Sequence, residues 1–297
     1  MTSSASEREK RGSRSGVLHV PSGAGMSHLR RSKSAVLGLL LTSSFVLMAL
    51  LAPLIAGDPI AFDLARQLLP PSAAHPLGTD ELGRDILSRL LWGSRSTLLI
   101  TLGAVALALG AGTVLGLIAG FRGGWSDTLI MRVMDIWLAM PTFLLAIAIV
   151  AALGAGTTNV IIAVGLSSIP AFARVARGCT LSIKQEVYVL AAQSMGAGDG
   201  VIMCRHILPN IVAPLLVQTS LRLATAILTA SGLSFLGLGP QPPTPEWGAM
   251  LDAARSDMML APHVALFPAI AIFVTVLAFN LLGDGLRDAL DPKIDRR

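Results

Sequence analysis

Residues 188–210, YVLAAQSMGAGDGVIMCRHILPN, interrupt two long apolar segments with a short polar stretch that is rich in Gly and Ala. The segment before it includes Ile136–Ala173, which contains no charged residue, and the chain becomes apolar again from Leu208 onward. In a chain otherwise suited to lipid, we expect this stretch to face water and to offer a small, smooth surface to another protein. The stretch therefore predicts a membrane subunit driven by a partner, and not an enzyme with its own active site.

The composition predicts an all-α membrane protein. The 297 residues are 53% hydrophobic and only 14% charged, with a mean hydropathy of +0.68. Soluble domains carry roughly 25% charged residues. A β-barrel would show alternating segments of about ten residues, whereas the apolar runs here are continuous and long enough for helices of about 20 residues.

The apolar runs predict six transmembrane helices. The turn-forming residues 154–159 divide the long charge-free run into two spans. The first span stands alone, and the other five form a core over residues 96–284 that contains a cytoplasmic loop at 177–208. The expected spans are residues 35–57, 96–121, 133–153, 159–176, 208–235 and 263–284. No Asp or Glu lies deep in any of them.

The distribution of Lys and Arg predicts that both termini are cytoplasmic. Residues 1–34 form a basic tail that we expect to be disordered, and residues 285–297 form a second basic tail. Cytoplasmic loops carry an excess of Lys and Arg, which places segment 58–95 outside. Topology thus accounts for the pI of 9.9, and no nucleic-acid partner is implied. The apolar run of the first span is longer than the roughly 7–15 residues of a secretion signal, so we expect an uncleaved anchor.

Segment 58–95 is expected to end in an amphipathic helix that leads into the second span. Thr79 is the expected N-cap, with Asp80 and Glu81 in the first turn, and Leu82 and Ile86 begin an apolar face. This element could brace the bundle or receive a docked partner. The later outside loop, residues 237–263, contains several prolines and Trp247, and we expect it to form part of an outer gate or docking surface.

Two patterns of helix-modifying residues mark the spans. Small residues spaced four apart let helix backbones approach closely in lipid. Such a pattern predicts close packing within the subunit or against a paired subunit, at Gly112, Gly116 and Gly120. Proline permits kinks, which suits a bundle that opens and closes, although proline is also common in transmembrane helices. One proline falls in each of the last four spans: Pro141, Pro170, Pro214 and Pro268.

Arg222 lies midway along the fifth span, where a central arginine costs about 2.5–3.5 kcal/mol on translocon scales. Such a residue usually faces a water-filled cavity or a partner. Arg222 could line a pathway and attract a peptide carboxylate, or it could contact backbone carbonyls or a paired subunit. His206 is expected to be an interfacial or capping side chain. Cys179 and Cys204, both predicted to be cytoplasmic, suggest neither a disulfide nor a metal site.

No catalytic or nucleotide-binding motif is present in the sequence. A phosphate-binding loop of the form G-x-x-x-x-G-K-[ST] does not occur, and no catalytic or metal-binding constellation is evident. We therefore expect no enzymatic activity, no cofactor and no metal on this chain. Any energy for transport would come from another chain.

The stretch LAAQSMGAGDGVIMCRHILP (190–209) resembles the coupling motif of ABC-importer permeases, EAA, three residues, G, nine residues, I, any residue, LP. Leu190 replaces the glutamate of the motif, and His206 replaces its isoleucine. Four further segments resemble the second permease subunit of the dipeptide, oligopeptide and nickel importers. They are HPLGTDELGRDILSRLLWG (75–93), GGWSDTLIMRVMD (123–135), LSFLGLGPQPPTPEWGAML (233–251) and FNLLGDGLRDALDP (279–292), and the resemblance covers residues 30–292.

The resemblance implies a type I ABC-importer permease in a bacterial or archaeal plasma membrane. It implies a short coupling helix over about 186–195 that seats in an ATPase, followed by a turn, with Pro209 starting the fifth span. The coupling residues carried over are Leu190, Ala191, Ala192, Gly196, Gly198, Asp199, Leu208 and Pro209. A lost surface ion pair at Leu190 costs only about 0–1 kcal/mol, so coupling should survive this substitution.

The same resemblance implies the partners and the cargo. The partners are a homologous first permease subunit, two cytoplasmic ABC ATPase subunits that bind ATP, and an extracytoplasmic solute-binding protein. A homodimer of permeases is the alternative assembly. The cargo would be a peptide or a related small solute, with nickel complexes included. The alternative function is an ion-coupled secondary transporter, which would need intramembrane carboxylates or broken helices in two repeats.

Overall fold

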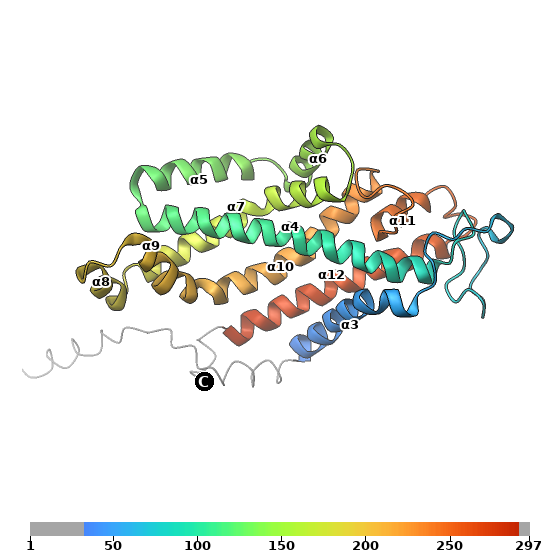
Figure 1. Cartoon of the computed structure of the whole chain (residues 1–297), viewed down its shortest axis with the longest axis horizontal. Coiled ribbons are helices and arrows are strands. Elements are labelled where there is room, and N and C mark those ends of the chain that lie inside the picture. Colours follow the sequence, from blue (N-terminus) through green and yellow to red (C-terminus); the bar gives the residue numbers. More distant parts are fainter. Residues whose placement is uncertain (1–32, 291–297) are drawn as a thin grey trace, which may run out of the picture.

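The computed structural model describes residues 33–290, and within them the long segments are all helical (Figure 1). The expected tails at 1–34 and 285–297 fall largely outside this described part. The long helices are α3 (Lys33–Ile55), α4 (Ile86–Arg122), α5 (Gly124–Leu138), α6 (Thr142–Leu153), α7 (Thr157–Ile183), α10 (Leu208–Phe235) and α12 (His263–Leu290). The short helical elements are η1 (Leu64–Arg66), α8 (Val187–Ser194), α9 (Asp199–Val201), a π-helical turn η2 (Ile202–Ile207) and α11 (Trp247–Ala253).

The predicted helical membrane architecture is confirmed, with one span built differently from the expectation. Five helical segments are long and apolar enough to cross a membrane, and the pair α5 and α6 passes the same criteria together but is bent by 91°. We expected one continuous helix over 133–153. Instead the span begins at Gly124 and breaks just before Pro141, because proline lacks an N–H donor and disfavours helical backbone in the residue before it.

The bent pair carries the chain from one end of the bundle to the other. Lys184, at the end of α7, donates a hydrogen bond to the carbonyl oxygen of Phe121, at the end of α4. The start of α7 lies at the opposite end, where the N–H of Gly156 donates to the carbonyl oxygen of Leu238, 3.3 Å away. The chain therefore enters α5 at one end and leaves α6 at the other. Counted as one broken span, α5 and α6 complete the predicted six crossings.

The start of α3 and the end of α12 lie at the same end of the bundle, beside each other (Figure 1). A Cβ atom added at Gly285 would come within 2.3 Å of the Cβ of Ala35, and one at Gly38 would come within 2.5 Å of the backbone nitrogen of Leu282. Six crossings, an even number, place both ends of the membrane-spanning part on the same side. This arrangement agrees with the expectation that the two termini share one side of the membrane.

The glycine stripe on α4 packs against α7 of the same chain. An added Cβ at Gly112 would lie 2.6 Å from the Cβ of Phe172, and one at Gly116 would lie 2.4 Å from the carbonyl oxygen of Ala173. At Gly120 it would lie 2.8 Å from the Cβ of Thr180. Only a residue without a Cβ fits at these three positions, and of the two partners left open by the spacing, a helix of the same chain is the one observed.

The expected amphipathic helix is not a separate element, and Thr79 is not an N-cap. Helix α4 is continuous over 37 residues and begins at Ile86, where the Asp85 carboxylate accepts a hydrogen bond from the N–H of Ser88 at 2.8 Å. The Thr79 hydroxyl instead accepts from the N–H of Leu69 at 2.8 Å and donates to the carbonyl oxygen of Arg66 at 2.5 Å. Thr79 thus joins two parts of the loop that precedes α4, while Asp85 caps the start of the helix.

Candidate coupling site and solute pathway

Helix α8 forms at the position where a short helix was predicted, and one of its faces is buried. Val189 is fully buried and Ala192, three residues later, is 4% exposed. Residues three apart lie on one helical face, and this face packs toward η2, whose Ile202 and Ile207 are also buried. The small side chain of Ala192 allows the helix to lie close to η2. The alanine of the motif at this position therefore has a packing role.

Gly196 ends α8 by a Schellman motif. Its φ is +81°, a conformation that favours glycine, and its N–H donates to the carbonyl oxygen of Gln193 at 2.9 Å. The N–H of Ala197 donates to the carbonyl oxygen of Ala192 at 3.1 Å. These two bonds are the pair that defines the motif. They fix where the chain reverses, so the predicted turn is confirmed and the glycine is required by its backbone conformation.

The outer face of this segment is apolar and protrudes. Leu190 is 48% exposed and Met195 is 81% exposed, and Val187, Tyr188 and Val201 are exposed beside them. Ala191, Gly198 and Asp199 also lie on the surface. The carboxylate of Asp199 lies in the first turn of α9, at the positive end of the helix. In this chain, therefore, the position of the motif glutamate carries a solvent-facing leucine among other apolar side chains.

Pro209 lies in the first turn of α10, as expected, but it does not start the helical segment. Helical backbone runs without a gap from Asp199 to Phe235, and η2 forms the wide turn immediately before Leu208. A proline ring clashes with the carbonyl four residues earlier, here that of Arg205, and a π-turn relieves this contact. The His206 ring lies 6.5 Å from the Tyr188 ring, so His206 braces α8 against η2.

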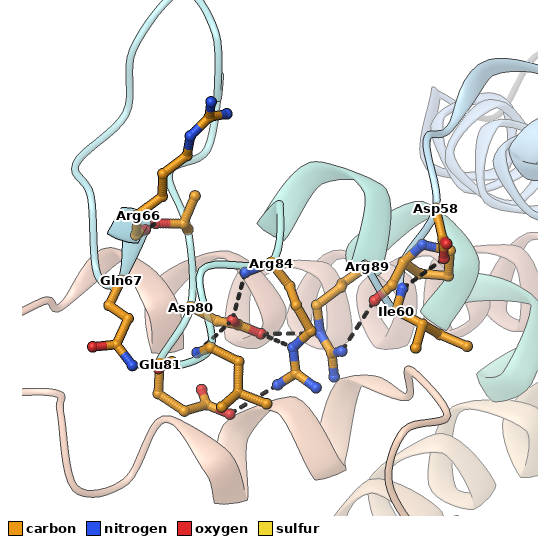
Figure 2. Close-up of polar contacts among 11 residues, drawn as sticks. Asp58, Ile60, Arg66, Gln67, Asp80, Glu81, Arg84 and Arg89 are labelled. Atoms are coloured by element: carbon orange, nitrogen blue, oxygen red, sulfur yellow. Dashed lines mark hydrogen bonds and ion pairs between the residues drawn. The ribbon is translucent and has the colours of Figure 1, made fainter. Parts of the chain in front are cut away.

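The opposite end of the bundle carries a buried ionic cluster (Figure 2). The Arg84 guanidinium pairs with Asp80 at 2.7 Å and with Glu81 at 2.8 Å, and Arg89 approaches the same Asp80 carboxylate at 3.3 Å. Arg89 also donates to the carbonyl oxygen of Pro59 at 3.2 Å. The cluster therefore ties the loop that follows α3 to the first turn of α4. Of the two roles considered for segment 58–95, this geometry supports the bracing role.

Glu246 and Trp247 fix the loop between α10 and α12. Trp247 is fully buried and donates from its indole nitrogen to the carbonyl oxygen of Leu90 at 2.9 Å, so it packs inside the bundle and does not belong to a docking surface. Glu246 is 1% exposed and caps α11 by accepting from the N–H of Ala249 at 2.9 Å. Burial raises the pKa of the Glu246 carboxyl above its usual value of 4.5.

Two carboxylates, Asp127 and Asp135, lie on α5 and bind arginines of α7. Asp127 accepts two hydrogen bonds from Arg177 of α7, at 2.5 and 2.7 Å, and Asp135 pairs with Arg174 at 2.7 Å. Asp127 lies before the expected third span and Asp135 lies near its first residue, so neither is a deep carboxylate of the kind that the expectation excluded. Each carboxylate has an arginine partner on α7, and the available signal was the pair of arginines three residues apart on one face of that helix.

Arg222 lies at the middle of α10 and is half-buried. Within residues 33–290 its guanidinium makes no hydrogen bond or ion pair, while its carbonyl oxygen accepts from the Thr225 hydroxyl at 3.0 Å. The structure does not bring Arg222 together with α8. The sequence thus predicted two separate features, a protruding helix at one end and an arginine within the spans.

Comparisons with known proteins agree on the family. Residues 112–296 match the model of the binding-protein-dependent transport system inner membrane component, and residues 25–71 match the N-terminal transmembrane domain of oligopeptide transport permease C. The chain is 58% identical over 233 residues to the glutathione transport system permease protein GsiD of Pectobacterium atrosepticum, covering 78% of this chain and 77% of that protein. It is 57% identical over 224 residues to the protein of the same name from an Escherichia coli strain, covering 75% and 74%.

A solved structure shows the same fold. An inward-facing conformation of the MetNI methionine ABC transporter matches with a TM-score of 0.57 at 17% identity, over 69% of this chain and 98% of that one. The chain belongs to the binding-protein-dependent transport system inner membrane components, as a permease of ABC importers of the oligopeptide permease C type.

Proposed function

We propose that this chain is the second of two homologous permease subunits in an ATP-driven importer, and that α8 seats in a cleft of a cytoplasmic ATPase subunit. The observation that carries the proposal is an exposed apolar surface at one end of the bundle, which we call the knob. It is formed by Val187, Tyr188, Leu190, Met195 and Val201. The Schellman turn at Gly196 holds this knob rigid. Family membership supports ATPase and binding-protein partners in general.

Movement of α8 has a direct structural route into the membrane. Helix α8 packs on η2, and η2 continues into α10 without a break in helical backbone. A displacement of the knob would therefore tilt α10, which contacts α4, α7 and α12. Inverting a two-state equilibrium from 1:99 to 99:1 takes about 5.5 kcal/mol, which ATP binding and hydrolysis in the partners could supply. Rigid helices moved at one end in this way would open the pathway first to one side of the membrane and then to the other, which is alternating access.

The proposed cargo is a small peptide or a related solute delivered by an extracytoplasmic binding protein. The curated relatives are named for glutathione transport, so glutathione is the first solute to test. Dipeptides, longer peptides and nickel complexes follow as further candidates from the resemblance. The bacterial relatives support an inner-membrane location.

The experiment is uptake of labelled glutathione into proteoliposomes that hold the complete importer, with binding protein added outside and ATP enclosed at the ATPase face. The proposal predicts uptake that requires ATP, both permease subunits and the binding protein. A matched preparation carries ATPase subunits unable to hydrolyse ATP, and it should show none. Uptake that persists in that preparation and follows an ion gradient would identify an ion-coupled carrier instead.

A further inference from the structure

Four polar side chains form a stripe along one face of α10. They are spaced four, three and four residues apart, which at about 100° per residue places them within roughly 60° of one another around the helix. The four are Gln218, Arg222, Thr225 and Thr229. Each is half-buried or exposed, whereas the opposite side of the helix carries buried residues such as Leu223 and Ile227. The stripe therefore lies on an open face of α10.

Several hydrogen-bonding groups of the stripe have no partner within residues 33–290. The two threonine hydroxyls donate within the helix, to the carbonyl oxygens of Arg222 at 3.0 Å and Thr225 at 2.9 Å, and their lone pairs stay free to accept. Across residues 33–290, neither the Arg222 guanidinium nor the Gln218 amide has a hydrogen-bond partner. The two carboxylates on α5, Asp127 and Asp135, already bind Arg177 and Arg174. A cation facing lipid in this state would be costly.

The outer part of this face lies beside the broken span. A Cβ added at Gly232, three residues beyond Thr229, would come within 2.9 Å of the ring of Phe143 in α6. The stripe thus runs from the middle of the bundle toward the point where α5 and α6 break. Backbone at such a break is tolerated at membrane depth where it is buried in protein or lines a water-filled cavity.

We infer that this stripe is a wall of the solute pathway and that the guanidinium of Arg222 binds a carboxylate of an anionic solute in transit. Gln218, Thr225 and Thr229 would offer hydrogen bonds to the amide groups of the same solute. A guanidinium suits this role because its planar donors match a carboxylate in pairs. The inference rests on the proposed import function and adds to it a solute class, peptides with a free carboxylate.

The transport test uses the complete importer in proteoliposomes, with labelled glutathione as the probe. Arg222→Gln should lower ATP-driven uptake about tenfold or more, since a hydrogen bond to a charged group is lost, while Arg222→Lys keeps part of it. Stimulated ATP hydrolysis and co-purification of the other subunits should be unchanged. Arg95→Gln removes an exposed cation from α4 and serves as the matched control, with uptake expected at the unaltered level.

Two results overturn the inference in this assay. The first is unchanged glutathione uptake with Arg222→Gln. The second is loss of the homologous permease subunit from the purified complex, which would make Arg222 an intersubunit contact.

A second measurement tests whether the stripe is exposed to water, and it does not depend on ATP-driven import. In a chain with Cys179 and Cys204 replaced by serine, Thr225→Cys should react with a membrane-impermeant, negatively charged thiol reagent. Leu216→Cys, an exposed apolar position away from the stripe on the same helix, should stay unlabelled, since the inference assigns the water-lined path to the stripe. Equal labelling of both positions, or of neither, contradicts the inference. Missing ATP-driven uptake together with selective labelling of Thr225→Cys would instead refute the import proposal while the water-lined stripe stands.

Discussion

Arg177 of α7 and Asp127 of α5 form a two-pronged ion pair, with Nε and Nη2 of the arginine 2.5 and 2.7 Å from the two carboxylate oxygens. This pair, together with Arg174 and Asp135, holds α5 to α7 on its polar side. The other side of α5 presents exposed Trp125, Leu129, Val133 and Ile136. Helix α5 is therefore held to the bundle partly by charge, beside the buried Met134, and its other, apolar face is left exposed.

The Arg177–Asp127 pair should show strong energetic coupling. In a double-mutant cycle with Arg177→Ala and Asp127→Ala, we expect a coupling of about 1.5–3 kcal/mol in the free energy of unfolding, because both hydrogen bonds are charge-assisted. The control pair is Arg66 and Asp63, which lies at the surface with side chains 57% and 48% exposed. It should give about 0–1 kcal/mol. Similar coupling in the two cycles, measured in mixed micelles, would contradict this assignment.

The α4–α7 contact should be intolerant of a single methyl group. Gly116→Ala would place a Cβ 2.4 Å from the carbonyl oxygen of Ala173, so the two helices must move apart, at a cost of about 1–3 kcal/mol in stability. Gly110→Ala is the matched control in the same helix, since an added Cβ there meets nothing within 4 Å. It should be neutral or stabilising by up to about 1 kcal/mol. Denaturant unfolding of both variants measures the difference, and equal losses would show that the helices are not in close contact.

Stability should fall as pH rises through the titration of Glu246. Burial raises the pKa of this carboxyl above 4.5, so the folded state holds the proton more tightly than the unfolded state does. The stabilisation is complete below 4.5 and is lost progressively as pH increases toward the folded pKa. Glu246→Gln keeps an acceptor for the N–H of Ala249 and removes the titration. Melting temperatures across this pH range should therefore decline less in the variant, and an unchanged slope would assign the pH dependence to other groups.

The turn after α8 should depend on Gly196 and not on Gly198. Gly196→Ala forces an L side chain into a left-handed conformation, which costs about 1–2 kcal/mol, whereas Gly198 has a φ of −67° and open space around it. We expect Gly196→Ala to speed hydrogen exchange at the amide of Ala197, which bonds to Ala192. Gly198→Ala should leave that exchange rate unchanged. Equal acceleration in both variants would mean that the Schellman turn does not hold the loop.

The sequence predicted those parts of the fold that depend on residue spacing alone. Long apolar runs located five of the six spans, and the glycines at 112, 116 and 120 predicted a close helix contact that the structure assigns to α7. The short helix at α8 was predicted from the resemblance. The turn at Gly196 was predicted because a sharp reversal of the chain favours glycine.

The features that spacing did not reveal depend on tertiary partners. Thr79 and Asp85 both have the chemistry of an N-cap, and the choice between them is made by the loop contacts of Thr79 with Arg66 and Leu69. The start of the third span was placed nine residues too late because Asp127 reads as polar until its partner Arg177 on α7 is known. Trp247 looked like a surface residue among prolines, yet its indole hydrogen-bonds Leu90, 157 positions away.

The most direct test of the account is photo-cross-linking from α8 in the assembled importer. A photoreactive amino acid at Leu190 or Met195, both exposed on the knob, should cross-link to an ATPase subunit and to no extracytoplasmic protein. The control is Met259, 96% exposed in the loop between α11 and α12, which should give no product with the ATPase. Cross-links from Leu190 to the solute-binding protein, or ATPase products from Met259 instead, would contradict the central claim that α8 is the coupling helix.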